Sequence, residues 1–330
     1  MIMTKMLKTL IMVAPLTTLR APFAVANTLQ YVGVDWSSIL VEERAGVVYK
    51  DTRSIGKPLE TILVEAGINM VWQRVWTVDG EYGTKYNLQL ARRAKDAGLN
   101  GWPQDIDGLE RQLWAYTTEV CNTFAAAGLY PETITIGNEI PSGFLWPTGH
   151  IDNPKNLSRL LHTAARAVRS SSLGTGTKIV THLAHGWDQD LVLVPGNLTI
   201  SNWGAIAVSF YPFWGEGASM ANLSATLNSL ASKYNKEVQV VKANWPTSCP
   251  NPEYPFPKDQ LDIPFSTTGQ VEYLRRLVST LKAIPATTGL NYWEPAWIRN
   301  AVLGSSCESN VLFDPNGKAY DSLSVFASLY

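Results

Sequence analysis

Short apolar runs rich in valine and isoleucine alternate with longer amphipathic stretches along the chain. We expect the runs to be strands and the stretches to be helices, because buried strands of a parallel sheet read as continuous apolar segments. The predicted strands are Tyr31–Asp35, Asn69–Val75, Thr133–Ile136, Lys178–His182, Ala205–Phe210, Val238–Lys242 and Gly289–Trp293. The predicted helices are Pro58–Ala66, Asn87–Ala97, Gln104–Ala127, Pro154–Ser170, Ala218–Tyr234 and Gln270–Ala283. Several of these helices end at a glycine, as is common at helix C-termini.

Seven strands in a chain of 330 residues favour a (β/α)₈ TIM barrel over an open doubly wound sheet. No phosphate-binding glycine motif follows any strand, which weakens the nucleotide-binding alternative. One stretch is irregular, because only Gly98–Pro103 separates two consecutive predicted helices. A regular barrel has a strand and its loop at that point, so the sequence predicts a barrel that lacks its third strand.

The N-terminus has the pattern of a secretory signal peptide. Lys5 and Lys8 precede the short apolar run Leu10–Leu16, and Ala24–Ala26 matches a cleavage site. We therefore expect residues 1–26 to be a signal peptide and residues 27–330 to be one catalytic-type barrel domain. Three glycosylation sequons, at Asn156, Asn197 and Asn222, fit a secreted, extracellular glycoprotein.

Net charge and composition limit the kinds of partner and environment that we expect for the protein. The formal net charge is −1 without a basic tract, so we expect no nucleic acid partner, and no later apolar run is long enough to span a membrane. Of the three cysteines, Cys121 falls within a predicted helix, which favours a disulfide between Cys249 and Cys307.

The residues that follow the predicted strands suit a sugar ligand, because aromatic faces stack on pyranose C–H surfaces and fixed polar groups bind hydroxyls. Functional residues of a barrel lie at these strand ends. They include Arg74, Asn138, Glu139, His182, Tyr211, Lys242, Trp293 and Glu294. Glycoside hydrolysis requires two carboxyl groups, and Glu139 is the natural acid among these residues. The alternative is that Glu139 is a solvated loop or first-turn glutamate.

Long strings of the sequence closely resemble fungal endo-β-1,4-galactanases of glycoside hydrolase family 53, from about Leu29 to the C-terminus. The strings are GVDWSSILVEERAGVVYK (33–50), QRVW (73–76), TIGNEI (135–140), GFLWPTGH (143–150), VSFYPFW (208–214), NWPTSCPNP (244–252), YWEPAWI (292–298) and LGSSC (303–307). The resemblance implies a (β/α)₈ barrel that cleaves β-1,4-galactan of type I arabinogalactan with retention of configuration. It also implies a Cys249–Cys307 disulfide and no cofactor or metal.

The resemblance gives Glu139 the role of proton donor and acid/base. It also implies that Arg74, Asn138, His182, Tyr211 and Trp293 bind the substrate. We expect a monomer whose partner is the galactan polysaccharide.

Two departures from the family pattern bear on activity. The family has a nucleophilic glutamate in V-V-E-T-N-W-P, and this chain has Lys242 at that position. The family's third strand, with its D-F-H-Y-S-D string, is absent between Leu99 and Gly101. In addition, Ala184-His185 stands where the family usually has Asp-Asn.

These departures leave three functional hypotheses. The chain is an active or ancestrally active galactanase, a catalytically inactive galactan-binding relative, or a truncated product of a skipped exon. Other interpretations of individual residues are also open. Lys242 would be a surface lysine if the strand register were shifted by one residue, and His182, His185 and Asp188 have the spacing of a weak metal-site motif. Glu294 could replace the nucleophile, but the family has a glutamate at that position too, in W-E-P, so a structural or binding role is favoured for it.

Overall fold

The computed structural model describes residues 10–15, 31–35, 42–43, 45–68, 70–75, 105–140, 142–192, 203–298, 307 and 309–329. For residues 10–15, 31–33, 35, 70–75 and 191–192 the description covers the backbone. The predicted helix Asn87–Ala97, the cleavage site Ala24–Ala26 and the sequon at Asn197 lie outside the described residues.

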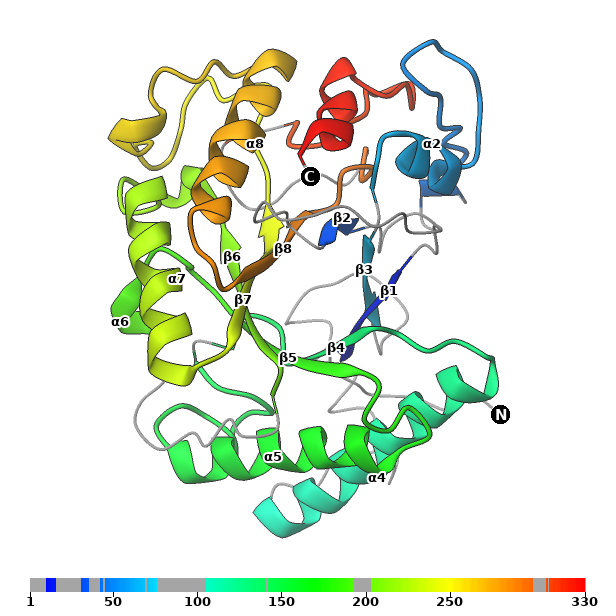
Figure 1. Ribbon diagram of the computed structural model, residues 1–330, viewed down its shortest axis with the longest axis vertical. Helices are drawn as coiled ribbons and strands as arrows, with labels where there is room; N and C mark the ends of the chain where they lie inside the picture. Colours follow the sequence, from blue (N-terminus) through cyan, green and yellow to red (C-terminus); the bar gives the residue numbers. More distant parts are fainter. Residues whose placement is uncertain are drawn as a thin grey trace, which may run out of the picture.

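The described strands form one closed barrel. They are β1 (Leu10–Pro15), β2 (Tyr31–Asp35), β3 (Met70–Val75), β4 (Thr133–Ile136), β5 (Lys178–Leu183), β6 (Ala205–Phe210), β7 (Glu237–Ala243) and β8 (Thr287–Tyr292). Their order around the barrel is β1-β3-β2-β8-β7-β6-β5-β4 (Figure 1). All pairs that do not involve β1 are parallel, as expected for a barrel built from strand–helix repeats. All seven predicted strands are confirmed to within two residues at each end.

The strand β1 corrects the expectation of a gap in the barrel. It runs antiparallel to both neighbours, with Leu10 opposite Val75 of β3 and Ile136 of β4. A barrel that lacks its third strand should either close with seven strands or leave two strand edges exposed at this place. The physical reason for the difference is that unpaired edge N–H and C=O groups are costly when buried. The N-terminal apolar run satisfies them, because main-chain pairing does not depend on strand direction.

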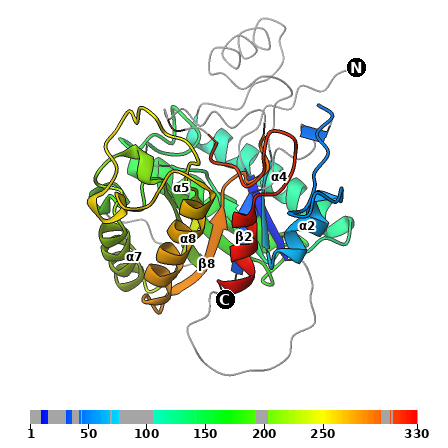
Figure 2. The ribbon, with the colours of Figure 1, turned by 90° about the horizontal axis from the view of Figure 1, so that it is seen from above.

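Helices surround the sheet, as Figure 2 shows for α2, α4, α5, α7 and α8. The helices are α2 (Leu59–Glu65), α4 (Ile106–Ala126), α5 (Pro154–Ser170), α6 (Gln189–Val192), α7 (Met220–Tyr234) and α8 (Thr267–Lys282), with 3₁₀ turns η1 (Pro212–Trp214), η2 (Lys258–Gln260) and η3 (Asp321–Ser328). Capping side chains start four of them. Asp105 accepts from the Gly108 N–H at 2.7 Å, and Asn153, Ser219 and Ser266 cap α5, α7 and α8 in the same way.

The ends of α2 and α4 follow the predicted glycine signal. Gly67 and Gly128 have φ angles of 87° and 73°, the left-handed conformation that glycine adopts without steric cost. A Cβ on Gly67 would lie 2.7 Å from the Cα of Ala327, so glycine at this position also permits the close approach of η3 to the end of α2.

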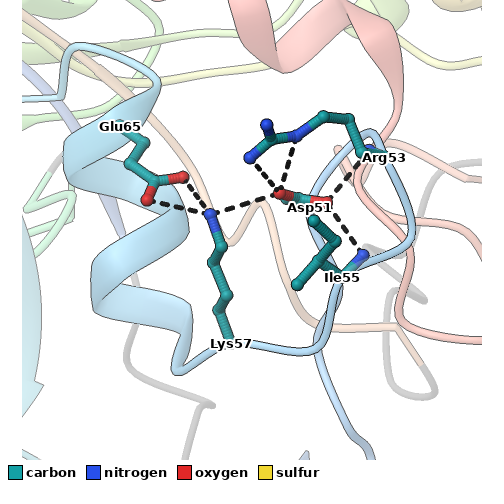
Figure 3. Close-up of polar contacts among 5 residues, drawn as sticks. All are labelled: Asp51, Arg53, Ile55, Lys57 and Glu65. Atoms are coloured by element: carbon teal, nitrogen blue, oxygen red, sulfur yellow. Dashed lines mark hydrogen bonds and ion pairs between the residues drawn. The ribbon is translucent and has the colours of Figure 1, made fainter.

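A cluster of charged side chains fixes the segment before α2 (Figure 3). The Asp51 carboxylate accepts from the backbone N–H groups of Arg53 and Ile55 at 3.0 and 2.9 Å. The Lys57 ammonium lies 3.2 Å from Asp51 and 2.6 Å from Glu65. The hydrogen bond from Ile55, together with both cations, lowers the pKa of Asp51 to about 2. These charges neutralise one another, so we assign the cluster a structural role, which is to order the loop before α2.

The disulfide prediction is confirmed. Cys249 and Cys307 are bonded across 58 residues of sequence, and Cys121 is a buried free thiol. The bond joins the loop that follows β7 to the segment that follows β8. Constraint of so long a loop is worth about 4 kcal/mol in the chain-entropy model.

Candidate active site

The strands β4 to β8 are parallel, so their carboxyl ends meet at one rim of the barrel. Backbone strain marks three positions on this rim. Glu139, His185 and Glu294, which follow β4, β5 and β8, have φ angles of 49°, 52° and 45°. Residues other than glycine rarely adopt this backbone conformation, and those that do are concentrated at functional sites. The strain therefore points to the rim as the site.

An ion pair lies at the centre of the rim. Lys242, near the end of β7, places its ammonium 3.2 Å from Oε1 of Glu139. The Lys242 side chain is 6% exposed and that of Glu139 is 32% exposed. Lys242 is therefore not the surface lysine of the alternative interpretation. The side chains at the ends of β4 and β7 converge on one point, with one carboxylate and one ammonium there.

A serine and a histidine from the neighbouring strands form a hydrogen-bonded series with Glu139. Ser209 on β6 donates a short hydrogen bond to Oε1 of Glu139, and Nε2 of His182 lies 2.9 Å from the same hydroxyl. A carboxylate only accepts, so the Ser209 hydroxyl gives its proton to Glu139 and accepts from His182 Nε2–H. His182 is fully buried, so its ring faces Ser209 and not the solvent.

Ser209 is not among the site residues predicted from the sequence. It is the polar residue next to the end of an otherwise apolar strand, AIAVSF, and that position is the signal that marks it. The preceding strand positions point to the barrel interior or the helix layer, whereas a polar residue next to the carboxyl end is placed to meet rim side chains.

The charges of the site are fixed by this arrangement. Burial raises the pKa of Glu139, but the Lys242 ammonium and the Ser209 hydrogen bond outweigh burial and lower it to about 2. Burial, with the same ammonium, lowers the pKa of His182 to about 3. Above these values Glu139 is ionised and His182 is neutral. In this state Glu139 cannot donate a proton.

The remaining rim residues offer polar and aromatic surface. The Oδ1 atoms of Asn138 and Asn244 are buried and have no hydrogen-bond partner among the described residues. The Trp293 ring centroid lies 6.0 Å from the Lys242 ammonium and 6.5 Å from the ring of the half-buried Tyr211. Arg74 lies at the end of β3, and its side chain is outside the description.

The suggested histidine–aspartate metal site is not assembled. His182 is buried against Ser209, whereas His185 and Asp188 are exposed on the loop that follows β5. Within the described ranges, no three or more His, Cys, Asp or Glu side chains are arranged to hold a metal ion. The described helices also include none that is long and apolar enough to cross a membrane.

Replacing Ser209 with alanine should change how stability depends on pH. The lowered pKa of Glu139 stabilises the folded state above the ordinary pKa of a glutamate, and this stabilisation is lost as the pH falls towards 2. Ser209→Ala removes one cause of that lowering. The free energy of unfolding should therefore fall less steeply between about pH 4.5 and pH 2 than in the unaltered protein, as measured by urea unfolding at each pH.

The matched control is Ser322→Ala. Ser322 is also buried, and its hydroxyl donates to the neutral Oε1 of Gln270 at 2.7 Å. Both substitutions should cost about 1–3 kcal/mol, because each leaves a buried polar partner unsatisfied. Only Ser209→Ala should alter the pH dependence, and parallel pH profiles for the two variants would contradict the assigned network.

Known proteins match this chain over most of its length. The family model for glycosyl hydrolase family 53 matches residues 31–102 and 100–326. An arabinogalactan endo-beta-1,4-galactanase of Humicola insolens is 47% identical over 328 residues, which cover 90% of this chain and 99% of that protein. A probable arabinogalactan endo-beta-1,4-galactanase A of Aspergillus tubingensis is 42% identical over 350 residues, covering 96% of this chain and all of that protein.

Solved structures agree with this similarity. A chain from a study of two fungal beta-1,4-galactanases superposes with a TM-score of 0.81 at 45% identity, covering 91% of this chain and 99% of that one. The GH53 catalytic domain of Ignisphaera aggregans shares the fold, with a TM-score of 0.71 at 24% identity over 93% and 97% of the two chains. The fold, the matched residues and the level of identity lead to one conclusion: the chain belongs to glycosyl hydrolase family 53.

Proposed function

We propose that the protein is directed at β-1,4-galactan of type I arabinogalactan, as an endo-acting, retaining glycoside hydrolase in which the catalytic pair is altered. Glu139 is the acid/base residue, and Lys242 stands at the nucleophile's position. The observation that carries the proposal is the meeting of Glu139 and Lys242 at 3.2 Å, from the ends of β4 and β7. Retaining glycosidases hold two carboxyl groups about 5–5.5 Å apart at such a place.

The chemistry of the pair decides how much hydrolysis remains. In a retaining mechanism the acid gives its proton to the leaving oxygen while the second carboxylate attacks the anomeric carbon. A protonated lysine has no lone pair for that attack, and its charge opposes the positive charge of the oxocarbenium-like transition state. The same ammonium holds Glu139 ionised, so Glu139 lacks the proton that the leaving oxygen needs.

In this proposal the residues that bind the sugar are kept, although the catalytic pair is altered. Trp293 and Tyr211 offer aromatic faces to the apolar side of a galactose ring, and the Oδ1 atoms of Asn138 and Asn244 are acceptors for sugar hydroxyls. Arg74 belongs to the same surface by its place at the end of β3. His182 acts through Ser209 and Glu139 instead of touching the sugar.

The Lys242–Glu139 pair also favours a second function, the binding of galactan without turnover. Affinity electrophoresis tests the substrate class for both functions. Migration of the unaltered protein should be retarded in gels that contain β-1,4-galactan and unchanged in gels that contain a β-1,4-glucan. Reducing-sugar release from the same galactan should stay near background. Equal migration in both gels at every polysaccharide concentration would refute the proposed substrate.

We also propose that the protein is a secreted, extracellular monomer. Glycosylation at Asn156 and Asn222 has a structural consequence. The amide nitrogen of Asn156 donates to the Thr148 carbonyl at 3.1 Å and that of Asn222 to the Gly217 carbonyl at 2.9 Å, both at helix starts. A glycan replaces one of the two hydrogens on this nitrogen, so in a glycosylated chain the remaining N–H has to carry the local hydrogen bond.

A further inference from the structure

Lys242 and Glu139 face opposite sides of the anomeric carbon that the proposed function places between them. In a retaining enzyme for β-linkages, the nucleophile attacks from the side opposite the β-linked oxygen, and the acid/base residue lies on the side of that oxygen. Lys242 stands at the nucleophile's position, so its ammonium faces the α side of a bound galactose ring, and the Glu139 carboxylate faces the β side. The two groups lie 3.2 Å apart in the free protein.

The Lys242 ammonium is a charge that requires an anion beside it. Its side chain is 6% exposed, and a buried charge is stable only when it is paired. Glu139 supplies that anion in the free protein. A sugar ring that enters between the two side chains separates them, and a neutral galactan chain leaves the ammonium without a partner. The site therefore favours a ligand that carries negative charge on the α side of its anomeric carbon.

Glu139 is in the form that accepts a proton. Burial raises its pKa, but the Lys242 ammonium and the hydrogen bond from Ser209 outweigh burial and lower the pKa to about 2. The Ser209 hydroxyl donates to Oε1, which fixes the orientation of the carboxylate at the rim. A carboxylate that cannot donate a proton to a leaving oxygen is suited to take one from an attacking hydroxyl.

We propose that the protein is a galactosyl transferase whose donor is an α-galactosyl phosphate and whose acceptor is the 4-hydroxyl at the non-reducing end of a β-1,4-galactan chain. The acceptor hydroxyl gives its proton to Glu139 while its oxygen attacks the anomeric carbon from the β side. The bond from that carbon to the phosphate oxygen breaks, and phosphate leaves on the α side with the electron pair, beside Lys242. One β-1,4 linkage and one inorganic phosphate form. The inference rests on the proposed function, because it uses the same site and polysaccharide.

Phosphate suits the two altered features of the site together. A phosphate monoester carries a charge of about −1.5 to −2 at pH 7, which replaces Glu139 as the partner of the Lys242 ammonium, and lysine binds phosphate as a point charge. Phosphate also leaves as a stable anion, so its departure needs no proton donor. Galactan hydrolysis needs both a proton donor and an attacking carboxylate. The ammonium that impedes hydrolysis therefore stabilises the leaving group of the transfer.

Incubation of the full chain with α-galactose 1-phosphate and β-1,4-galactotriose at pH 7 tests the proposal. Galactotetraose, measured by anion-exchange chromatography, and inorganic phosphate should form in equal amounts. Glu139→Gln should slow the transfer about 10²- to 10⁴-fold, because the base is lost. α-Galactosyl fluoride serves as a second donor, since its small leaving group depends less on the ammonium. Lys242→Gln should therefore slow transfer from the phosphate about 10²-fold more than transfer from the fluoride.

The matched control is Lys178→Gln. The Lys178 ammonium also pairs with a glutamate, Glu237 at 2.5 Å, but this pair lies at the start of β5 and β7, at the opposite end of the barrel. Its loss should change neither rate, and circular dichroism establishes that each variant is folded.

The outcomes separate the transfer from the proposed function. Binding of galactotriose, measured by calorimetric titration, without elongation would overturn the transfer and leave the proposed function standing. Phosphate release without elongation would also overturn it, as would an equal loss with both donors in Lys242→Gln. If neither galactotriose nor longer β-1,4-galactan binds the unaltered protein, the proposed function fails together with the transfer.

Discussion

Replacing Lys242 with glutamate is expected to raise the release of reducing sugar from β-1,4-galactan by several orders of magnitude over the unaltered protein. Loss of a nucleophile costs about 10⁶-fold in turnover in a serine protease, which sets the upper range of the gain. Glutamate at position 242 would return the attacking carboxylate to the end of β7, opposite Glu139. It would also remove the ammonium that lies 3.2 Å from the acid/base carboxylate.

The pH dependence of the variant should report on Glu139. In the unaltered protein the pKa of Glu139 is lowered to about 2, chiefly by the Lys242 ammonium acting against the effect of burial. In Lys242→Glu a like charge replaces that ammonium, so the pKa of the acid must rise above its ordinary value. The activity of the variant should therefore fall as the pH rises through this raised pKa, because the proton donor ionises there.

Lys242→Gln is the control for this prediction. It removes the charge without supplying a nucleophile, so it should free Glu139 to take up a proton and yet give no comparable gain in turnover. Adding Glu139→Gln to the Lys242→Glu variant should abolish the gain. Robust hydrolysis by the unaltered protein would refute the assignment of Lys242 to the nucleophile's position. If Lys242→Glu folds and stays inactive, the third strand of the family must be restored as well before the galactanase interpretation is tested in full.

The strands were predictable because each is a short apolar run between turn residues, and burial on both faces leaves few other possibilities. All four residues of β4 are buried, as are all six of β6. The position of β1 was not predictable in this way. The run Leu10–Leu16 has the composition of a signal peptide, and its pairing with β3 and β4 depends on an unfilled edge elsewhere in the barrel. The composition of this run alone does not indicate that an unpaired strand edge exists elsewhere in the barrel.

Chain position alone also located the carboxylate and the lysine of the site. Glu139 and Lys242 each fall at the end of a strand, and parallel strands bring those ends together. The partnership of His182 with Ser209 was not predictable, because it depends on which face of β5 and β6 each side chain takes. In the proposed function, the buried His182 therefore acts through Ser209, with which it shares a hydrogen bond.

Removal of residues 1–26 is expected to destabilise the barrel severely. β1 faces six residues of β3 and four residues of β4, and its loss leaves both edges without a partner. At about 1 kcal/mol per net hydrogen bond, the loss amounts to several kcal/mol. That is comparable with the whole stability of an ordinary domain, about 5–15 kcal/mol. The shortened protein should melt at a lower temperature and aggregate through the exposed edges, as measured by calorimetry and light scattering.

Two further variants distinguish the role of β1 in the barrel from a general effect of truncation. Deletion of residues 1–9 leaves β1 whole and should keep the melting temperature of the full chain. Insertion of the family's third strand and loop after Leu99, in the chain that lacks residues 1–26, should restore a cooperative monomer. The role of β1 as a barrel strand and the removal of residues 1–26 by a signal peptidase exclude each other in one molecule. N-terminal sequencing of the secreted protein decides between them: a stable protein that begins after Ala26 and melts as high as the full chain would show that the barrel closes without β1.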